Sequence, residues 1–206
     1  MAWIMLQELG RKIIHITILI VLVIYAFLQR RFLDAGYSEM GAKQIALLFP
    51  VCLLVLFLVL EYFRLELGWK VPYFSQFIRA KEQNRMSGVV YFLSATIICL
   101  SVFDYSISLT ALLLTTFGDM MAALFGKKYG TTLIYRNKTW AGFVAELITN
   151  LIVGLLILYE TPGFIYIVIG MAAVATIVET MVDELDDNLL VPIFCGFIGQ
   201  IILFAL

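Results

Sequence analysis

The sequence predicts an all-α fold, a polytopic integral membrane helical bundle with about seven transmembrane helices in a single catalytic domain, residues 1–206. Hydrophobic residues make up 63% of the chain and charged residues only 14%, and the mean hydropathy is +1.00. A soluble domain carries roughly 25% charged residues, so this composition places the chain in the membrane class. The apolar residues also gather in runs long enough to cross a bilayer.

These apolar runs have about 16 to 20 residues, close to the ~20 that a helix needs to cross a ~30 Å hydrocarbon core. Tight turns near Asp104 and at Thr161–Pro162 predict two helical hairpins. The three cysteines lie within apolar runs without close spacing, so we expect buried free thiols. The predicted spans are about 13–28, 45–63, 86–103, 106–125, 142–159, 163–182 and 189–206.

The distribution of charge predicts the orientation of the chain. The N-terminal tail and the segments after the second, fourth and sixth spans carry eleven Lys and Arg residues, whereas the opposite side carries three. The positive-inside rule therefore places the N-terminus and these segments in the cytoplasm. The net charge of −1 gives no indication of a nucleic-acid partner.

Ionisable side chains inside a membrane span are costly and usually functional. Asp119, Glu146 and Glu179 fall within the fourth, fifth and sixth spans, and His15 stands at the start of the first. At ~1.5 Å per residue, each lies roughly 5–10 Å from the end of its helix that carries the basic segments. We therefore expect a functional site at the cytoplasmic end of the bundle.

The N-terminal segment places four polar residues on one face of a helix. Glu8, Arg11, Lys12 and His15 stand at positions i, i+3, i+4 and i+7. Arg11 and Lys12 either bind an anionic ligand or only anchor the helix at the membrane surface. For His15, a role at the site and simple burial both remain open.

The fourth span ends in a segment that combines small residues, a carboxylate and two cations. Gly118, Ala122, Gly126 and Gly130 recur every four residues, which allows another helix or a ligand to approach the backbone closely. The same stripe permits a homodimer. Helix packing gives no reason for Asp119, so we expect Asp119 to bind a ligand or a metal. Lys127 and Lys128 follow it and are candidate ligands for an anion.

The segment that enters the fifth span contains Asn137, Lys138, Thr139 and Gly142. A lysine, a hydroxyl and a glycine at the start of a helix suit a polyphosphate, because helix N-termini and lysines favour anions. The Walker A pattern is absent. The positive-inside rule alone explains part of this charge.

The last polar segment is acidic and precedes the seventh span. Carboxylate and amide oxygens are suitable ligands for Mg²⁺, and we expect Glu179 and Asp187 to serve there, with Asn188 in support. For Asp183, Glu184 and Asp186 we favour pairing with the basic segments.

Taken in order, five pieces of the sequence resemble the family of phytol kinases, dolichol kinases and CTP-dependent diacylglycerol kinases over nearly the whole chain. The pieces are E-x-x-R-K-x-x-H from Glu8, Arg85-x-x-Gly88, the glycine-rich Gly118–Gly130, N-K-T-x-x-G from Asn137, and E-x₇-D-N-x-x-x-P from Glu179. The region 118–142 is also similar to CDP-diacylglycerol synthases, but Asn137 and Ala141 depart from their K-K-T-W-E-G element, and their longer Asp-rich signature is absent.

The resemblance implies CTP as the phosphoryl donor, Mg²⁺ as the cofactor and a membrane lipid alcohol as the acceptor. In the resulting hypothesis, Asp119 and Asp187 bind Mg²⁺ with support from Glu179 and Asn188, and Gly118, Asn137, Thr139 and Gly142 help to bind the nucleotide. Lys127, Lys128, Lys138, Arg11 and Lys12 neutralise the triphosphate. Asp187, Glu179 and His15 are all candidates for the general base.

Two other classes of protein remain as alternatives. A cytidylyltransferase would use the same cations and metal but transfer CMP to a lipid phosphate. A small transporter would use the intramembrane acids for ion coupling, although such acids usually lie near the midplane and between inverted repeats. The sequence does not identify the lipid alcohol.

Overall fold

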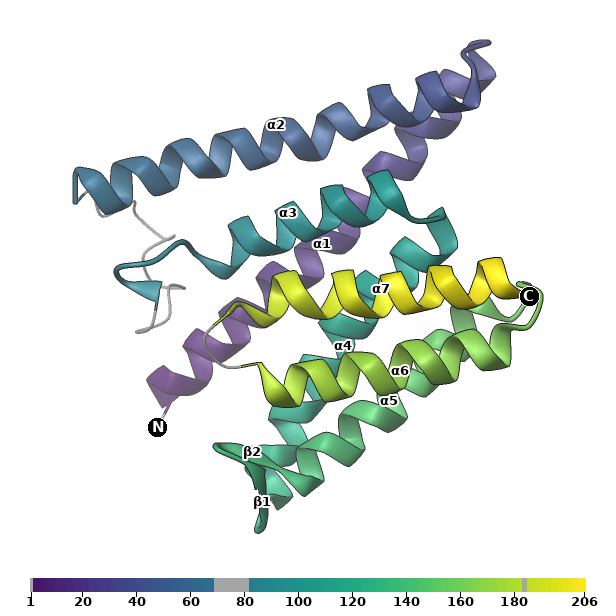
Figure 1. Ribbon diagram of the computed structural model, residues 1–206. Coiled ribbons are helices and arrows are strands. Elements are labelled where there is room, and N and C mark those ends of the chain that lie inside the picture. The colour runs from purple at the N-terminus through teal and green to yellow at the C-terminus, as the bar shows by residue number, and fades with distance from the viewer. Residues whose placement is uncertain (1, 69–81, 183–184) are drawn as a thin grey trace. The chain divides into compact units, whose positions relative to one another are not determined.

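The computed structural model describes residues 2–68, 82–182 and 185–206, and side chains within these ranges from residue 18 onward (Figure 1). The described residues form an all-α bundle with one short β-hairpin, which confirms the predicted fold class. The helices are α1 (Ala2–Asp34), α2 (Glu39–Glu66), α3 (Gly88–Val102), α4 (Tyr105–Tyr129), α5 (Trp140–Leu158), α6 (Phe164–Met181) and α7 (Asp187–Ala205). The strands are β1 (Leu133–Tyr135) and β2 (Lys138–Thr139).

Each predicted span falls on one helix. Among the described residues, α4, α5, α6, α7 and residues 39–65 of α2 are long and apolar enough to cross a membrane, whereas α3 is a shorter apolar helix. The chain is therefore an integral membrane protein. The predicted starts and ends of the first two spans were too narrow: α1 continues past Arg30 and Arg31 to Asp34, and α2 begins at Glu39. Cations are favourable in the last turn of a helix, and the Ser38 side chain caps α2 by accepting a hydrogen bond from the Gly41 N–H at 3.2 Å.

The chain divides into an N-terminal unit (residues 1–97) and a C-terminal unit (residues 98–206). The prediction of a single catalytic domain stays a prediction. In the N-terminal unit, α1 and α2 pack against each other. The tight turn that joins them contains Gly36, whose φ is 88°. This left-handed backbone favours glycine over other residues.

An arginine near the end of α2 holds the chain segment that precedes α3. The Arg64 guanidinium donates to Glu61 Oε2 from Nε at 3.1 Å and from Nη2 at 2.5 Å. Its Nη1 donates to the carbonyl oxygens of Glu82 and Gln83, both at 3.1 Å, and Nη2 also donates to that of Arg85. Glu61 is only 1% exposed. The pair therefore has a structural use, because it fastens residues 82–85 to the helix end.

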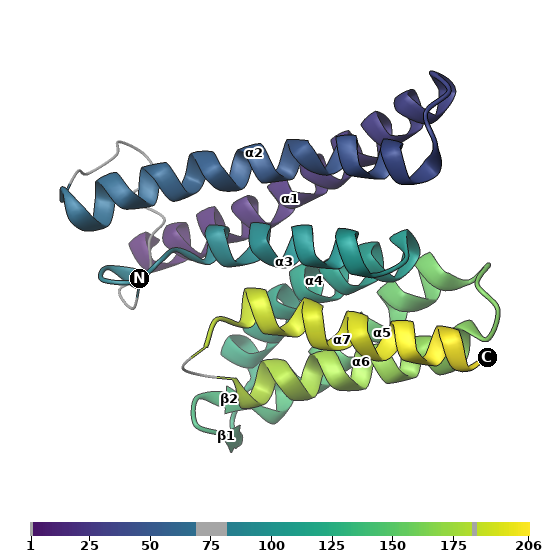
Figure 2. The same cartoon turned by 45° about the horizontal axis from the view of Figure 1, so that its top comes forward.

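In the C-terminal unit, α5, α6 and α7 run alternately up and down beside α4 (Figures 1 and 2). The predicted hairpins are present: α3 and α4 meet at Phe103–Asp104, and residues 159–163 join α5 to α6. The core is apolar, and small residues allow close helix contacts: Gly154 lies against Val168, and Gly199 lies against Met171. Packed in this way, the helices hold their ends at fixed relative positions.

All three cysteines are free, as predicted, but their burial differs. Cys99 and Cys195 are buried, whereas Cys52 is exposed on α2. The expectation of burial was wrong for Cys52 because an apolar residue of a membrane helix is as stable against lipid as against protein.

Five chain segments meet at one end of the C-terminal unit. They are the last turns of α4, the β-hairpin, the first turn of α5, the last turns of α6 and the first turn of α7 (Figures 1 and 2). β1 and β2 pair antiparallel, with Leu133 opposite Thr139. Arg136 in the turn has a φ of 45°. This hairpin was not predicted from the sequence, and it carries several candidate site residues.

Candidate functional site

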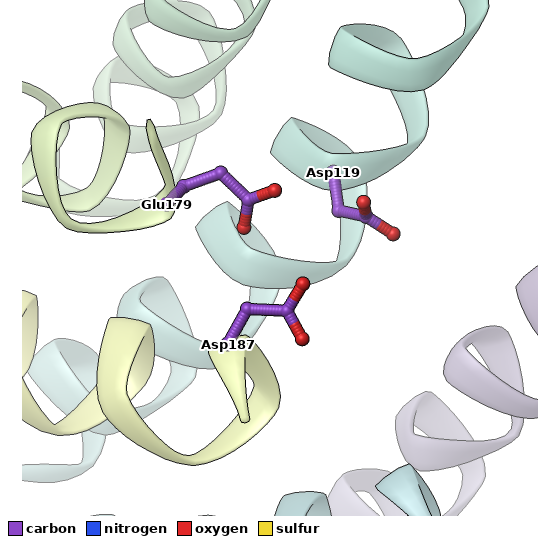
Figure 3. Close-up of side chains that lie close together, drawn as sticks. All are labelled: Asp119, Glu179 and Asp187. Carbon is purple, nitrogen blue, oxygen red and sulfur yellow. The ribbon is translucent and has the colours of Figure 1, made fainter. Parts of the chain in front are cut away.

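Three carboxylates from three different helices come together at this end of the C-terminal unit. Asp119 of α4, Glu179 of α6 and Asp187 of α7 each offer an oxygen atom, and these oxygens all lie within 4.8 Å of one another (Figure 3). Glu179 is 1% exposed, whereas Asp119 and Asp187 are half-buried. The sequence-based prediction named these three residues as metal ligands, and the fold gathers them from positions up to 68 residues apart along the chain.

Each acidic residue of the cluster has a defined place on its helix. Asp119 follows Gly118 in the interior of α4, and Glu179 lies in the last turn of α6. Asp187 is the first residue of α7, and the side chain of Asp186 caps that helix by accepting a hydrogen bond from the Asn188 N–H at 3.0 Å. The Asn188 amide donates to the same Asp186 oxygen at 2.7 Å. Asn188 therefore helps to order the first turn of α7, which carries Asp187.

Lys138 of β2 is a cation that contacts the cluster. Its ammonium donates to Glu179 Oε1 at 2.5 Å. Burial favours a lower pKa for Lys138, but the negative charge of Glu179 and the hydrogen bond to it, with further contributions from Asp119 and Asp187, raise the pKa above its ordinary value. Lys138 therefore stays charged throughout the neutral range, bound to the acidic cluster.

A cavity of about 220 Å³ adjoins the cluster. Asp119 belongs to both, and Lys138, which contacts Glu179, also lines the cavity, so the cluster and the cavity form one site. Its small or apolar lining residues are Ala122, Ala123, Gly126, Gly142 and Phe143, and its polar lining residues are Asp119, Lys127, Asn137, Lys138, Thr139, Glu146 and Thr180.

The wall of this cavity includes the N-terminus of α5. The Thr139 side chain accepts a hydrogen bond from the Gly142 N–H at 3.2 Å, which caps the helix. Gly126 and Gly142 let α4 and α5 cross closely here: a Cβ on Gly142 would lie 2.9 Å from the Ala122 carbonyl oxygen, and one on Gly126 would lie 3.1 Å from Thr139 Oγ1. Part of the small-residue stripe therefore serves packing within the chain, and the predicted homodimer stays a prediction.

The residues present fit a divalent cation. Three carboxylates from three helices lie within reach of one another beside the Lys138 ammonium, a set of groups that one divalent ion could bridge. Oxygen donors alone, half-open to the adjoining cavity, are the ligand type that Mg²⁺ prefers, with water or phosphate oxygens completing its shell. Asp119, Glu179 and Asp187 are the residues that would hold such a cation.

The other predicted residues fall into three groups. Lys127, Asn137, Thr139 and Gly142 line the cavity. Gly118 packs against α5, and the exposed Lys128 lies over the Tyr129 ring with its ammonium 5.1 Å from the ring centroid. The side chains of Arg11, Lys12 and His15 lie outside the described part of the molecule, as do Asp183 and Glu184, so their roles stay predictions.

Sequence reasoning assigned no role to two buried polar residues beside the site. Glu146 lines the cavity and is 3% exposed, and it was recognised only as an unusual acid within a span. Asn150, one turn further along α5, is fully buried. An uncharged amide in an apolar run gives little signal, although its spacing of four residues from Glu146 places both on one helix face.

Comparison with curated proteins finds distant similarity to lipid kinases. Over 129 residues the chain is 27% identical to phytol kinase 1 of Arabidopsis thaliana, a match that covers 55% of this chain and 42% of the relative. It is 25% identical over 173 residues to the CTP-dependent diacylglycerol kinase 1 of Saccharomyces cerevisiae, covering 78% and 54%. An uncharacterised protein of Rickettsia prowazekii is 27% identical over 195 residues, covering 90% of each chain.

These matches confirm the predicted resemblance to the family of CTP-dependent lipid kinases, at a distant level of identity. The chain spans about half the length of the curated kinases that it matches. No protein-family model matches the chain, and no solved structure matches it.

Proposed function

We propose that this protein transfers the γ-phosphoryl group of CTP to the hydroxyl group of a membrane lipid alcohol, at the cytoplasmic face and with Mg²⁺ as cofactor. The observation that carries the proposal is the meeting of Asp119, Glu179 and Asp187 beside a cavity lined by Lys127 and Lys138. The distant similarity to a phytol kinase and a CTP-dependent diacylglycerol kinase supports the same reaction class.

Phosphoryl transfer depends chiefly on positioning and on stabilising charge, so a protein needs cations and metal ligands around the phosphates. Asp119, Glu179 and Asp187 would hold Mg²⁺, which supplies positive charge next to the phosphate oxygens when it is bound. Lys138 and Lys127 would contact the remaining phosphate oxygens, and the N-terminus of α5 adds a favourable dipole on the same wall. These groups give the cavity the means to hold a polyphosphate.

In the proposed reaction, the lipid hydroxyl oxygen forms a bond to the γ-phosphorus, and the bond between that phosphorus and the oxygen bridging to the β-phosphate breaks. The products are CDP and a lipid phosphate, and the hydroxyl proton passes to a general base. Asp187, Glu179 and His15 remain the candidates for this base.

The location of the site at the helix ends suits a substrate with an apolar tail and a polar hydroxyl. Exposed apolar side chains cover α5, α6 and α7 along the length that faces lipid. A lipid alcohol can remain in the membrane while its hydroxyl reaches the level of Asp119. The basic residues of this end support a cytoplasmic location by the positive-inside rule, and CTP would then enter from that side.

The direct test uses purified protein in detergent with Mg²⁺ and a panel of prenols, diacylglycerol and phosphatidate. Parallel reactions contain CTP labelled at the α or at the γ phosphorus, and ATP labelled at γ serves as the nucleotide control. We expect label from γ-labelled CTP in an organic-phase product, with the productive alcohol identifying the substrate.

Two results would contradict the proposal. Label from α-labelled CTP in a product formed from phosphatidate would make the protein a cytidylyltransferase. If neither α-labelled nor γ-labelled CTP labels any lipid, in protein that remains folded, the protein does not carry out CTP-dependent transfer to these substrates.

A further inference from the structure

A buried side chain of α5 contacts α4 and α6, the two helices that carry Asp119 and Glu179. The Asn150 amide donates from Nδ2 to Thr176 Oγ1 of α6 at 3.1 Å. Both residues are fully buried. Thr176 lies one helical turn before Glu179 on α6. This hydrogen bond joins α5 to α6 directly beneath the acidic cluster.

The other end of the same amide faces α4. A Cβ atom on Gly118 would lie only 2.7 Å from Asn150 Oδ1, so the helix backbone at this position packs directly on the amide. Gly118 immediately precedes Asp119. One amide thus sits against the turn that carries Asp119 and donates to the turn that precedes Glu179.

The polar character of residue 150 works against stability. Asn150 Oδ1 is buried and accepts no hydrogen bond, and an unsatisfied buried polar atom carries a free-energy cost. A leucine of similar size would pack in an apolar helix interface without that cost. An asparagine at this place is therefore better explained by what it does for the site than by stability alone.

We infer that Asn150 is a positioning residue, whose contacts with Thr176 and Gly118 set the spacing of α4 and α6 and thereby the affinity of Asp119 and Glu179 for a divalent cation. The inference rests on the metal site of the proposed function but not on CTP or the lipid. Groups that hold metal ligands in place without touching the metal typically change metal affinity by about 10–100-fold when they are replaced.

The experiment measures Mn²⁺ binding to the purified protein by electron paramagnetic resonance, without nucleotide or lipid. We expect Asn150→Leu to raise the Mn²⁺ dissociation constant about tenfold or more, with little change in melting temperature. Thr176→Val, which removes only the acceptor hydroxyl, should weaken binding in the same way, whereas Thr176→Ser should keep wild-type affinity. The double variant should bind no more weakly than Asn150→Leu, because Thr176→Val removes a hydrogen bond that Asn150→Leu has already lost.

Thr149→Val is the matched control, because the Thr149 hydroxyl only donates to the Ala145 carbonyl within α5 at 2.7 Å. Wild-type affinity in Asn150→Leu and Thr176→Val, or equal weakening in Thr149→Val, would overturn the inference. If Asn150→Leu does not fold, the comparison of Thr176→Val with Thr176→Ser decides the matter.

The outcome also separates this inference from the proposed function. A wild-type protein that binds no Mn²⁺ would remove both the metal site and the positioning role. A protein that binds Mn²⁺ in an Asn150-dependent manner but does not phosphorylate lipids with CTP would retain the inference and lose only the proposed reaction.

Discussion

Among the described residues, a buried glutamate of the N-terminal unit and an acidic cluster of the C-terminal unit each contact a cation, and the two differ in their surroundings. In the N-terminal unit, Glu61 pairs with Arg64, whose other donors bind three backbone carbonyl oxygens. In the C-terminal unit, three carboxylates share the neighbourhood of Lys138, and a cavity adjoins them. The Glu61–Arg64 pair holds a loop to the end of α2, so its role is structural. The three acids near Lys138 adjoin a cavity and can bind a further cation.

The largest effect that distinguishes the two groups should come from metal removal. We expect a chelator such as EDTA to abolish phosphorylation of the lipid and added Mg²⁺ to restore it, because the acidic cluster requires a divalent cation to bind the phosphates. The measurement is transfer of label from γ-labelled CTP before and after chelation. The Glu61–Arg64 pair already holds its own cation, so the melting temperature should change little. Full activity in EDTA would refute a metal-dependent site.

Replacement of each cation should separate the two groups further. Lys138→Met should lower kcat/KM for CTP by about 10²-fold or more, because one positive group next to the transferred phosphate is lost. The folded protein should persist, since the Lys138 side chain is 38% exposed and water can compensate for part of the loss. Steady-state kinetics with circular dichroism would check both statements. Activity close to wild type would show that Lys138 contacts no phosphate.

Arg64→Met should have the opposite profile. It breaks a buried ion pair and frees three carbonyl oxygens, so we expect the free energy of unfolding to fall by about 3–5 kcal/mol. Mn²⁺ affinity of the remaining folded protein should not change. Arg31→Met, an exposed arginine at the end of α1, is the matched control and should be neutral. A stable Arg64→Met protein with weakened Mn²⁺ binding would reverse the assignment of the two groups.

The smallest expected effect concerns the helix cap beside the cavity. Thr139→Ala removes the hydroxyl that accepts from Gly142 N–H, which should cost about 1 kcal/mol of stability. The KM for CTP should rise with little change in the Mn²⁺ dissociation constant, because Thr139 lines the cavity but is not one of the clustered acids. Thr139→Ser, which keeps the hydroxyl, should behave as wild type. An unchanged KM in Thr139→Ala would limit the residue to capping.

Much of the fold was predictable because membrane helices follow from apolar runs alone. All seven runs became helices, and the errors lie at their ends, where Ser38 and the Arg30–Arg31 pair extend α2 and α1 beyond the hydrophobic stretch. The β-hairpin between α4 and α5 was missed because its strands, Leu133–Tyr135 and Lys138–Thr139, are too short to show a strand pattern in the sequence.

Asp119, Glu179 and Asp187 were found because a carboxylate within or next to an apolar run is conspicuous. The contacts between side chains around the site could not be predicted from the sequence. The contact of Lys138 with Glu179 joins residues 41 positions apart, and that of Asn150 with Thr176 joins residues 26 apart. Glu61 was overlooked because it lies at the end of an apolar run, where an acid is expected in the interface. The sequence alone does not distinguish Glu61, which pairs with an arginine, from the three acids that form a cluster. That difference appears only when the helices are packed.

The most direct test of this account compares lipid phosphorylation by Asp119→Asn, Glu179→Gln and Asp187→Asn with that by Glu61→Gln, each in protein shown to be folded. The amides keep the size of the side chains and remove the charge. We expect each of the first three to lose activity by about 10²-fold or more, and Glu61→Gln to retain wild-type turnover per folded molecule. Near-normal turnover in the three cluster variants would contradict the assignment of Asp119, Glu179 and Asp187 as the catalytic centre.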